Sequence, residues 1–265
     1  MVARGDGLSY CAGEVRRGDR ERYLTALFAP AARREDLFAL YAFNIAIART
    51  REIVSEPLIG AMRLQWWRDV LAAIEAGRPP AHPVATALGD AMRRHDLAHA
   101  PFEALIEARS FDLADEPPAD LDAVESYVEA SAAPLVLLAL DVLGASGDAA
   151  REAGRHVAIA WALTGLLRVV PAHASASRST LPITTDERAT IAEVARMART
   201  HMEKARALRR DVPRAALPAL LLAPLADAYL RRLARANHDP HAASIEMSGP
   251  IRQWHLLRYA AFARY

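Results

Sequence analysis

Apolar residues recur at spacings of three and four along almost the whole chain, and the alternating pattern of a half-buried strand never persists. The pattern therefore predicts an all-α protein. The predicted helices cover residues 10–27, 34–54, 57–76, 83–94, 101–114, 121–143, 149–170, 186–210, 215–236 and 250–262. Pro218 and Pro224 should kink or break the ninth of these, because proline removes a helical hydrogen bond.

Turn-forming residues separate the predicted helices, as in Gly77-Arg78-Pro79-Pro80 and Gly144-Ala145-Ser146-Gly147. No stretch between helices is long enough to act as a linker between two domains. We therefore expect residues 1–265 to form a single-domain helical bundle.

One face of the predicted helix 34–54 carries Tyr41, Asn44, Ala48 and Glu52, which follow a single stripe along the helix. A stripe that combines polar, small and aromatic groups could line a cavity. On the residues alone, it could equally be ordinary core.

The helix 149–170 carries a comparable face, and Pro171 should end or kink this helix just beyond it. Its members are Trp161, Gly165, Arg168 and Val169. This face too could line a cavity, or it could be core with an arginine that reaches along apolar surface to water.

Composition excludes little. Hydrophobic residues make up 52% of the chain, and the net charge of +1 gives no general reason to expect a nucleic-acid partner. Lys204 is the only lysine, so arginine carries nearly all the positive charge; this bias could serve anion binding or reflect genome composition. Cys11 is the only cysteine, which rules out an internal disulfide.

Two further features bear on location. No apolar run typical of a secretory signal is visible near the N-terminus. The most apolar stretches, 132–140 and 217–225, are shorter than the roughly 20 residues that a spanning helix needs. We expect a soluble or peripheral protein in the cytoplasm.

An ordered series of short runs resembles the squalene and phytoene synthase family between about residues 10 and 233. The runs are Asp19-Arg20-Glu21-Arg22-Tyr23, Leu27-Phe28-Ala29-Pro30, Arg34, Leu37-Phe38-Ala39-Leu40-Tyr41-Ala42-Phe43, Tyr127, Leu166-Leu167-Arg168, Arg178 and Leu181-Pro182. The resemblance implies the isoprenoid synthase fold, an all-α bundle with a central cavity.

The family's reaction, as the resemblance implies it, needs two acidic clusters that hold magnesium against a diphosphate. The first cluster's positions carry Ala48, Arg49 and Glu52, and the second's carry Val169 and His173. Only Glu52 is acidic, and alanine and valine offer no ligand atom. We therefore expect metal-dependent prenyl transfer to be absent, with no catalytic residue, no metal ligand and no cofactor.

A second set of residues resembles the family's non-catalytic branch, typified by the sixth assembly factor of mitochondrial respiratory complex I. These residues are Asn44, Ala48, Arg49, Val54-Ser55-Glu56, Gly60 and Met62-Arg63-Leu64-Gln65-Trp66-Trp67-Arg68. The resemblance implies an assembly or chaperone-like role near the inner membrane, with a respiratory complex subunit as partner and a lipid or prenyl chain as ligand. Thr180 departs from the aromatic residue that the synthases have before Leu-Pro.

The predicted ligand-binding residues combine the two helix faces with the motif positions. They are Tyr41, Asn44, Ala48, Arg49, Glu52, Arg168, Val169, His173 and Arg178. The arginines, together with Arg51, could bind phosphate without a metal, or they could pair with Glu52, Glu56 and Asp112 as structural bridges.

Glu107 and Asp112 are five residues apart, so they do not lie on one face of a helix and should not form a catalytic carboxylate pair. Trp66 and Trp67 could form a membrane or partner contact, but we expect them to be split between core and boundary.

Three hypotheses follow. The favoured one is an inactive assembly factor or a protein that binds a lipid or prenyl chain. The second is an active prenyl transferase whose altered magnesium site uses Glu52, Glu56, Asp112 and His173. The third is a membrane-surface or structural interaction protein without a pocket ligand.

Overall fold

The computed structural model describes residues 8–54, 56–113, 116–175, 180–182, 184–242, 246–262 and 264–265, and for 172–175 it describes the backbone alone. The chain is 76% helical, and these described ranges contain no strand. The all-α prediction and the isoprenoid synthase fold are confirmed.

The helices follow the predicted order, with some predicted helices divided in two. They are α1 (Tyr10–Gly18), α2 (Arg20–Ala26), α3 (Ala31–Ala48), α4 (Thr50–Ile53), α5 (Pro57–Glu75), α6 (Pro83–His95), α7 (Ala100–Phe111), α8 (Leu121–Leu143), α9 (Asp148–Ser175), α10 (Glu187–Ala207), the 3-10 turn η1 (Arg214–Ala216), α11 (Leu217–Leu220), α12 (Leu222–Arg235) and α13 (Gly249–Ala261).

The predicted helix 10–27 is wrong as a single element, because the chain breaks at Asp19 between α1 and α2. Asp19 has a non-helical backbone with φ −146° and ψ 79°, and its side chain accepts a hydrogen bond of 2.9 Å from the backbone N–H of Arg22. This is an N-cap interaction, which starts a new helix at Arg20. The predicted helix 34–54 likewise divides at Arg49, between α3 and α4.

Proline acts differently in two other helices. The predicted helix 215–236 is divided at Leu221, between the prolines at 218 and 224, as expected. In α9 the helix continues through Pro171 to Ser175, so the predicted end at residue 170 is wrong. The helix α9 packs against α8 and α10, and tertiary packing is the main source of helix stability in proteins.

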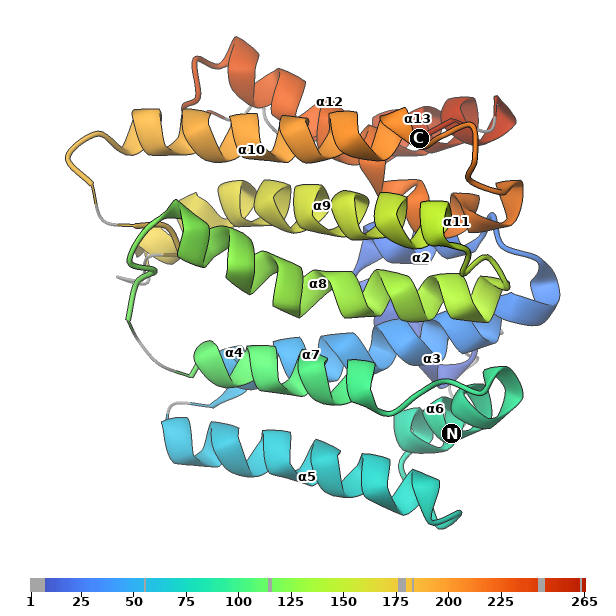
Figure 1. The fold of residues 1–265 in the computed structure, drawn as a ribbon. Helices are drawn as coiled ribbons and strands as arrows, with labels where there is room; N and C mark the ends of the chain where they lie inside the picture. Colours follow the sequence, from blue (N-terminus) through green and yellow to red (C-terminus); the bar gives the residue numbers. More distant parts are fainter. Residues whose placement is uncertain are drawn as a thin grey trace, which may run out of the picture.

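Long helices lie side by side in Figure 1, with α5 at the bottom, α7 and α3 above it, then α8, α9 and α10. The helix α9 packs against both α8 and α10, and α3 packs against α8 and α6. Apolar side chains fill the space between these helices, and Phe43 packs edge-on against Trp67 and Phe102 at centroid distances of 5.2 and 5.6 Å.

The helix α8 lies in the middle of this arrangement. Asp120 caps its N-terminus, and Gly144 ends it in the left-handed conformation at φ 68°. By length and composition alone α8 could cross a membrane, but 61% of its most apolar window is buried inside the structure. Burial of this extent is typical of the core helix of a folded bundle.

Candidate functional site

The first acidic motif of the resemblance maps onto the junction of α3 and α4. Ala48 is the last residue of α3, Arg49 joins the two helices, and Glu52 lies on α4 with its side chain exposed. Ala48 and Arg49 are half-buried. The three positions of this motif thus provide one methyl group, one positive charge and a single carboxylate.

Arg49 lies against the C-terminus of α1. A Cβ atom built on Gly18 would be 3.3 Å from the Nη2 atom of Arg49 and 3.1 Å from the side chain of Ile45. Glycine at position 18 therefore allows the close approach of α1 to α3. The guanidinium group near the carbonyl end of α1 interacts favourably with the helix dipole.

Tyr41 and Asn44 lie about two turns and about one turn before this junction, and both are buried. The Arg22 guanidinium group is 5.8 Å from the centroid of the Tyr41 ring. Burial raises the pKa of Tyr41 to about 12, so its phenol is neutral at physiological pH. The tyrosine can therefore donate a hydrogen bond but cannot act as a base.

The Asn44 side chain contains an unsatisfied polar atom. Its Oδ1 atom is buried and has no hydrogen-bond partner among the residues that the structure describes. A buried amide oxygen without a donor costs about 1–3 kcal/mol. Such groups in native proteins need an explanation, and a bound ligand or water is one of the usual ones.

Arg168 on α9 is held by a network of acidic and aromatic groups. Its Nε atom is 3.1 Å from Glu246, its Nη2 atom is 3.7 Å from Glu21, and its guanidinium carbon lies 4.1 Å above the centre of the Tyr229 ring. Burial lowers the pKa of Arg168, but the hydrogen bond to Glu246 and the nearby charges outweigh burial and raise it. Arg168 is therefore always charged and contacts two carboxylates.

The carboxylate of Glu21 ties this network to two further helices. It accepts a hydrogen bond of 2.6 Å from Arg252 on α13 and one of 3.3 Å from the hydroxyl group of Tyr229 on α12. The partners of Arg168 are thus Glu21 and Glu246, and not the residues Glu52, Glu56 or Asp112 named for a structural bridge.

Of the other predicted ligand-binding residues, Val169 is half-buried on α9 and offers no ligand atom. Arg178 lies outside the described residues, and so does the side chain of His173. Trp67 is 3% exposed and Trp66 is 41% exposed, so the predicted division of this pair between core and boundary is confirmed.

The remaining acids named for an altered metal site do not converge. Asp112 accepts a hydrogen bond of 2.5 Å from Tyr127 and pairs with Arg109 at 3.2 Å. Glu56 is exposed at the N-cap of α5. Glu107, which is not part of that predicted site, pairs with Arg68 at 2.7 Å. Within the described part of the chain, no three His, Cys, Asp or Glu side chains come together as metal ligands. The described residues therefore do not fit a magnesium cluster.

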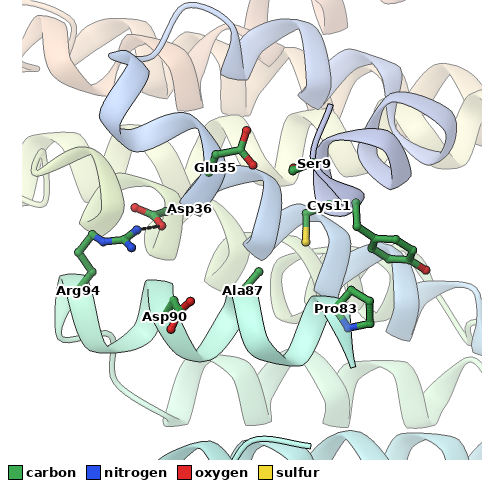
Figure 2. A pocket seen from close by; sticks show the side chains of 9 residues that line it. Ser9, Cys11, Glu35, Asp36, Pro83, Ala87, Asp90 and Arg94 are labelled. Carbon is green, nitrogen blue, oxygen red and sulfur yellow. Dashed lines mark hydrogen bonds and ion pairs between the residues drawn. The ribbon is translucent and has the colours of Figure 1, made fainter. Parts of the chain in front are cut away.

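A surface pocket of about 270 Å³ lies between α1, α3 and α6 (Figure 2). Asp36 forms an ion pair with Arg94 at its edge, and burial raises the pKa of Cys11 to about 11, so the thiol stays protonated. Glu35 and Asp90 add two further carboxylates. None of the predicted ligand-binding residues lines this pocket, and its acidic wall does not suit an apolar chain.

A second buried polar cluster, formed by two histidines, was not predicted from the sequence. His156 on α9 and His201 on α10 are 6% and 4% exposed, and their Nδ1 atoms are 2.9 Å apart. Each ring places its Nε2 atom against a carboxylate, His156 at 3.1 Å from Glu152 and His201 at 2.9 Å from Glu125. Nothing local to either histidine marks a partner that lies 45 residues away.

The fold defines the class of the protein as an all-α isoprenoid synthase-type bundle. Its structure matches a squalene synthase, HpnC, from Alicyclobacillus acidocaldarius with a TM-score of 0.77 over 87% of this chain and 94% of that chain, at 20% identity. A dehydrosqualene synthase matches with a TM-score of 0.80 over 96% and 95% of the two chains, at 18% identity. At these identities the likeness concerns the fold alone.

The family model for squalene/phytoene synthase matches residues 15–252, and the chain belongs to this family. Its relatives include NADH dehydrogenase (ubiquinone) complex I, assembly factor 6, of Bos taurus, which is 32% identical over 94% of this chain and 82% of the relative. The protein of that name from Homo sapiens is 30% identical over 91% of this chain and 78% of the relative.

A more distant relative has the name of an enzyme. The presqualene diphosphate synthase of Rhodopseudomonas palustris is 27% identical over 60% of this chain and 57% of its own length. The family model and the two assembly-factor relatives confirm the resemblance to the family and to its assembly-factor branch.

Proposed function

We propose that this protein is a squalene/phytoene synthase-like assembly factor for a respiratory complex and does not catalyse metal-dependent prenyl transfer. Its similarity to the assembly factor 6 proteins, over more than nine-tenths of the chain, supports the role. In this proposal it works in the cytoplasm, at the periphery of the inner membrane, with a subunit of the respiratory complex as partner.

The observation that carries the proposal is the chemistry at the junction of α3 and α4. Hard cations such as magnesium need oxygen ligands. Ala48 has none, Arg49 repels a cation, and Glu52 is left without a second acid from the motif. Val169 removes a further ligand position on α9.

We further propose that the interior of the bundle holds a lipid or prenyl chain. The unsatisfied Oδ1 atom of Asn44 supports a polar contact for such a ligand. A Cβ atom built on Gly165 would meet no atom within 4 Å, which supports open space beside α9. Residues 41, 44 and 48 share one face of α3, which would line the same interior.

Titration calorimetry with farnesyl or geranylgeranyl diphosphate, with and without magnesium, and with product analysis, tests the absence of transfer. We expect no condensed product and no effect of magnesium on binding. A condensed product that requires magnesium and disappears in Glu52→Gln would overturn the proposal and favour an active prenyl transferase.

A separate experiment tests whether the interior of the bundle holds a lipid or prenyl chain. Gly165→Phe should fill the open space and weaken binding of a farnesyl diphosphate or farnesol probe about tenfold or more, while Gly165→Ala serves as the matched control. Equal binding by both variants and the wild type would argue against a ligand beside α9.

The assembly role is tested in the source organism. Deletion of this protein should lower the amount of assembled NADH dehydrogenase complex in membranes, measured on native gels, and a copy with Glu52→Gln should restore it. Restoration by the wild type but not by Glu52→Gln would instead point to a reaction that needs this acid.

A further inference from the structure

The helix α13 packs on the bundle with one face and leaves the other face uncovered. Leu256 is buried on the inner face, and Arg252 reaches inward to Glu21 at 2.6 Å. On the outer side Trp254 is 67% exposed, Leu257 is 56% exposed and Phe262, just beyond the helix, is 68% exposed. Large apolar side chains are therefore presented to solvent by a helix that is firmly attached.

These side chains form one stripe. Ile251, also exposed, stands three residues before Trp254 and six before Leu257, and Phe262 follows three turns after Ile251. At 3.6 residues per turn these positions share the outward side of the helix. We call the four residues Ile251, Trp254, Leu257 and Phe262 the α13 face.

The charged side chains of the segment that carries the α13 face are all basic. From Met247 to Tyr265 the sequence has no Asp or Glu, whereas Arg258 lies exposed within the stripe and Arg264 follows it. On the adjoining helix α12, Arg231 and Arg235 are also exposed, and Arg231 lies 3.6 Å from Asp227.

The local field reflects this excess of positive charge. The pKa of His255 is lowered, first by burial and then by the charges of Arg231, Arg232 and Arg258.

An apolar stripe with a tryptophan, flanked by arginines and free of acids, is the pattern of a helix that lies in the plane of a membrane interface. Its apolar side chains enter the boundary of the acyl chains, and each arginine near an anionic surface adds about 1 kcal/mol of attraction. A second copy of this chain fits less well, because a symmetric contact would bring the Arg258 residues of both copies to one interface.

We propose that the α13 face docks this protein on a bilayer containing anionic phospholipids, with Trp254 and Leu257 entering the interface and Arg258 contacting headgroup phosphates. This inference deepens the peripheral membrane contact of the proposed function and names the surface that makes it. It does not depend on a ligand inside the bundle.

Co-sedimentation of the full chain with vesicles tests the inference. The vesicles are made of phosphatidylcholine alone or of phosphatidylcholine mixed with phosphatidylglycerol. We expect binding to the mixed vesicles, weakened by salt, together with a blue shift of tryptophan fluorescence. Trp254→Ser combined with Leu257→Ser should weaken binding at least tenfold and abolish the shift, and Arg258→Glu should weaken it about fivefold or more.

The control removes two large apolar side chains of similar fractional exposure from a different surface. Leu58 and Met62 on α5 are 70% and 65% exposed, and Figure 1 places α5 at the opposite end of the molecule from α13. Leu58→Ser combined with Met62→Ser should leave vesicle binding unchanged, and circular dichroism should show that both double variants are folded.

The possible outcomes distinguish the α13 face as the docking surface from the peripheral membrane contact of the proposed function. Binding that survives in the α13 variants but is lost in the α5 variant would overturn the α13 face while keeping the membrane contact. If the wild type bound neither kind of vesicle, both the α13 face as a docking surface and the peripheral membrane contact would be overturned. A dimer of the wild type that dissociates in Trp254→Ser, without vesicle binding, would assign the face to a second copy instead.

Discussion

The Nδ1 atoms of His156 and His201 are 2.9 Å apart in the interior between α9 and α10. Each ring also contacts a carboxylate through Nε2, so both Nε2 atoms serve best as donors. If both Nδ1 atoms carried a proton, two N–H groups would face each other across this short distance.

Acid should therefore destabilise the protein through this pair. The pKa of His156 is lowered by burial first and then by the charge of His201; Glu152 opposes the shift, and Arg155 and Lys204 add to it. As the pH falls through the unfolded value of about 6.5, the unfolded chain takes up a proton that the folded chain refuses, so stability falls.

Urea unfolding of the wild type and of His156→Gln, at several pH values between neutral and mildly acidic, checks this sign. The wild type should lose more stability on acidification than the variant. Parallel pH profiles would contradict a role for His156. At neutral pH we expect His156→Ala to cost about 2 kcal/mol, from the lost contact and the cavity.

Glu21 is expected to be a strong stabilising residue. Its carboxylate, on a side chain only 10% exposed, faces Arg168 and Arg252 together with the hydroxyl group of Tyr229. Glu21→Gln removes the negative charge that these two partly buried guanidinium groups face. Loss of one partner from a buried ion pair lowers the free energy of unfolding by about 3 kcal/mol.

Chemical unfolding gives the measurement for Glu21. Glu193→Gln is the control, because the pair of Glu193 with Arg196 lies on the surface and should contribute nothing measurable. Equal midpoints for the two variants would show that solvent screens the network around Glu21.

Tyr127 is expected to act through structure and not through catalysis. Its hydroxyl group donates to Asp112 at 2.5 Å and accepts from Arg109 at 3.1 Å, and burial raises its pKa. Tyr127→Phe should lower the free energy of unfolding by about 1–2 kcal/mol, since it leaves both partners short of one hydrogen bond. Thermal unfolding measures the change, with Tyr10→Phe at an exposed site as control; no difference between the two would mean that water replaces the hydroxyl group.

Local signals explain how much of the fold could be predicted. The range of α8 is predicted correctly at both ends, because Asp120 and Gly144 are cap residues that act within one turn. The break at Asp19 is missed, because the apolar spacing continues across it while the cap forms through one side chain.

The candidate site was predictable only in part. The loss of ligand atoms at Ala48 and Val169 can be predicted, because the surrounding residues identify these positions as members of the two acidic motifs. The partners of Arg168 cannot, because Glu21 and Tyr229 lie 208 residues apart and meet through packing alone. The contact between His156 and His201 could not be predicted either, because these residues are 45 positions apart and meet only when α9 packs against α10.

Two glycines of α9 provide a matched pair for the last prediction. A Cβ atom on Gly154 would lie 2.8 Å from Leu140 and 3.2 Å from Val136, whereas one on Gly165 would meet nothing within 4 Å. Alanine favours a helix over glycine by about 1 kcal/mol at either position. At Gly154 the crowding of α8 should outweigh this gain, since overpacking of a core costs about 1–3 kcal/mol.

Gly165→Ala should therefore stabilise the protein by about 0.5–1 kcal/mol, and Gly154→Ala should destabilise it by about 1–2 kcal/mol. Urea unfolding of both variants under the same conditions measures the difference in sign. If Gly165→Ala also destabilised the protein, the space beside Gly165 would have to be filled, and the argument for a ligand there would lose its support. If Gly154→Ala were stabilising, Leu140 would have to move aside at little cost, and the contact between α8 and α9 would be looser than the structure shows.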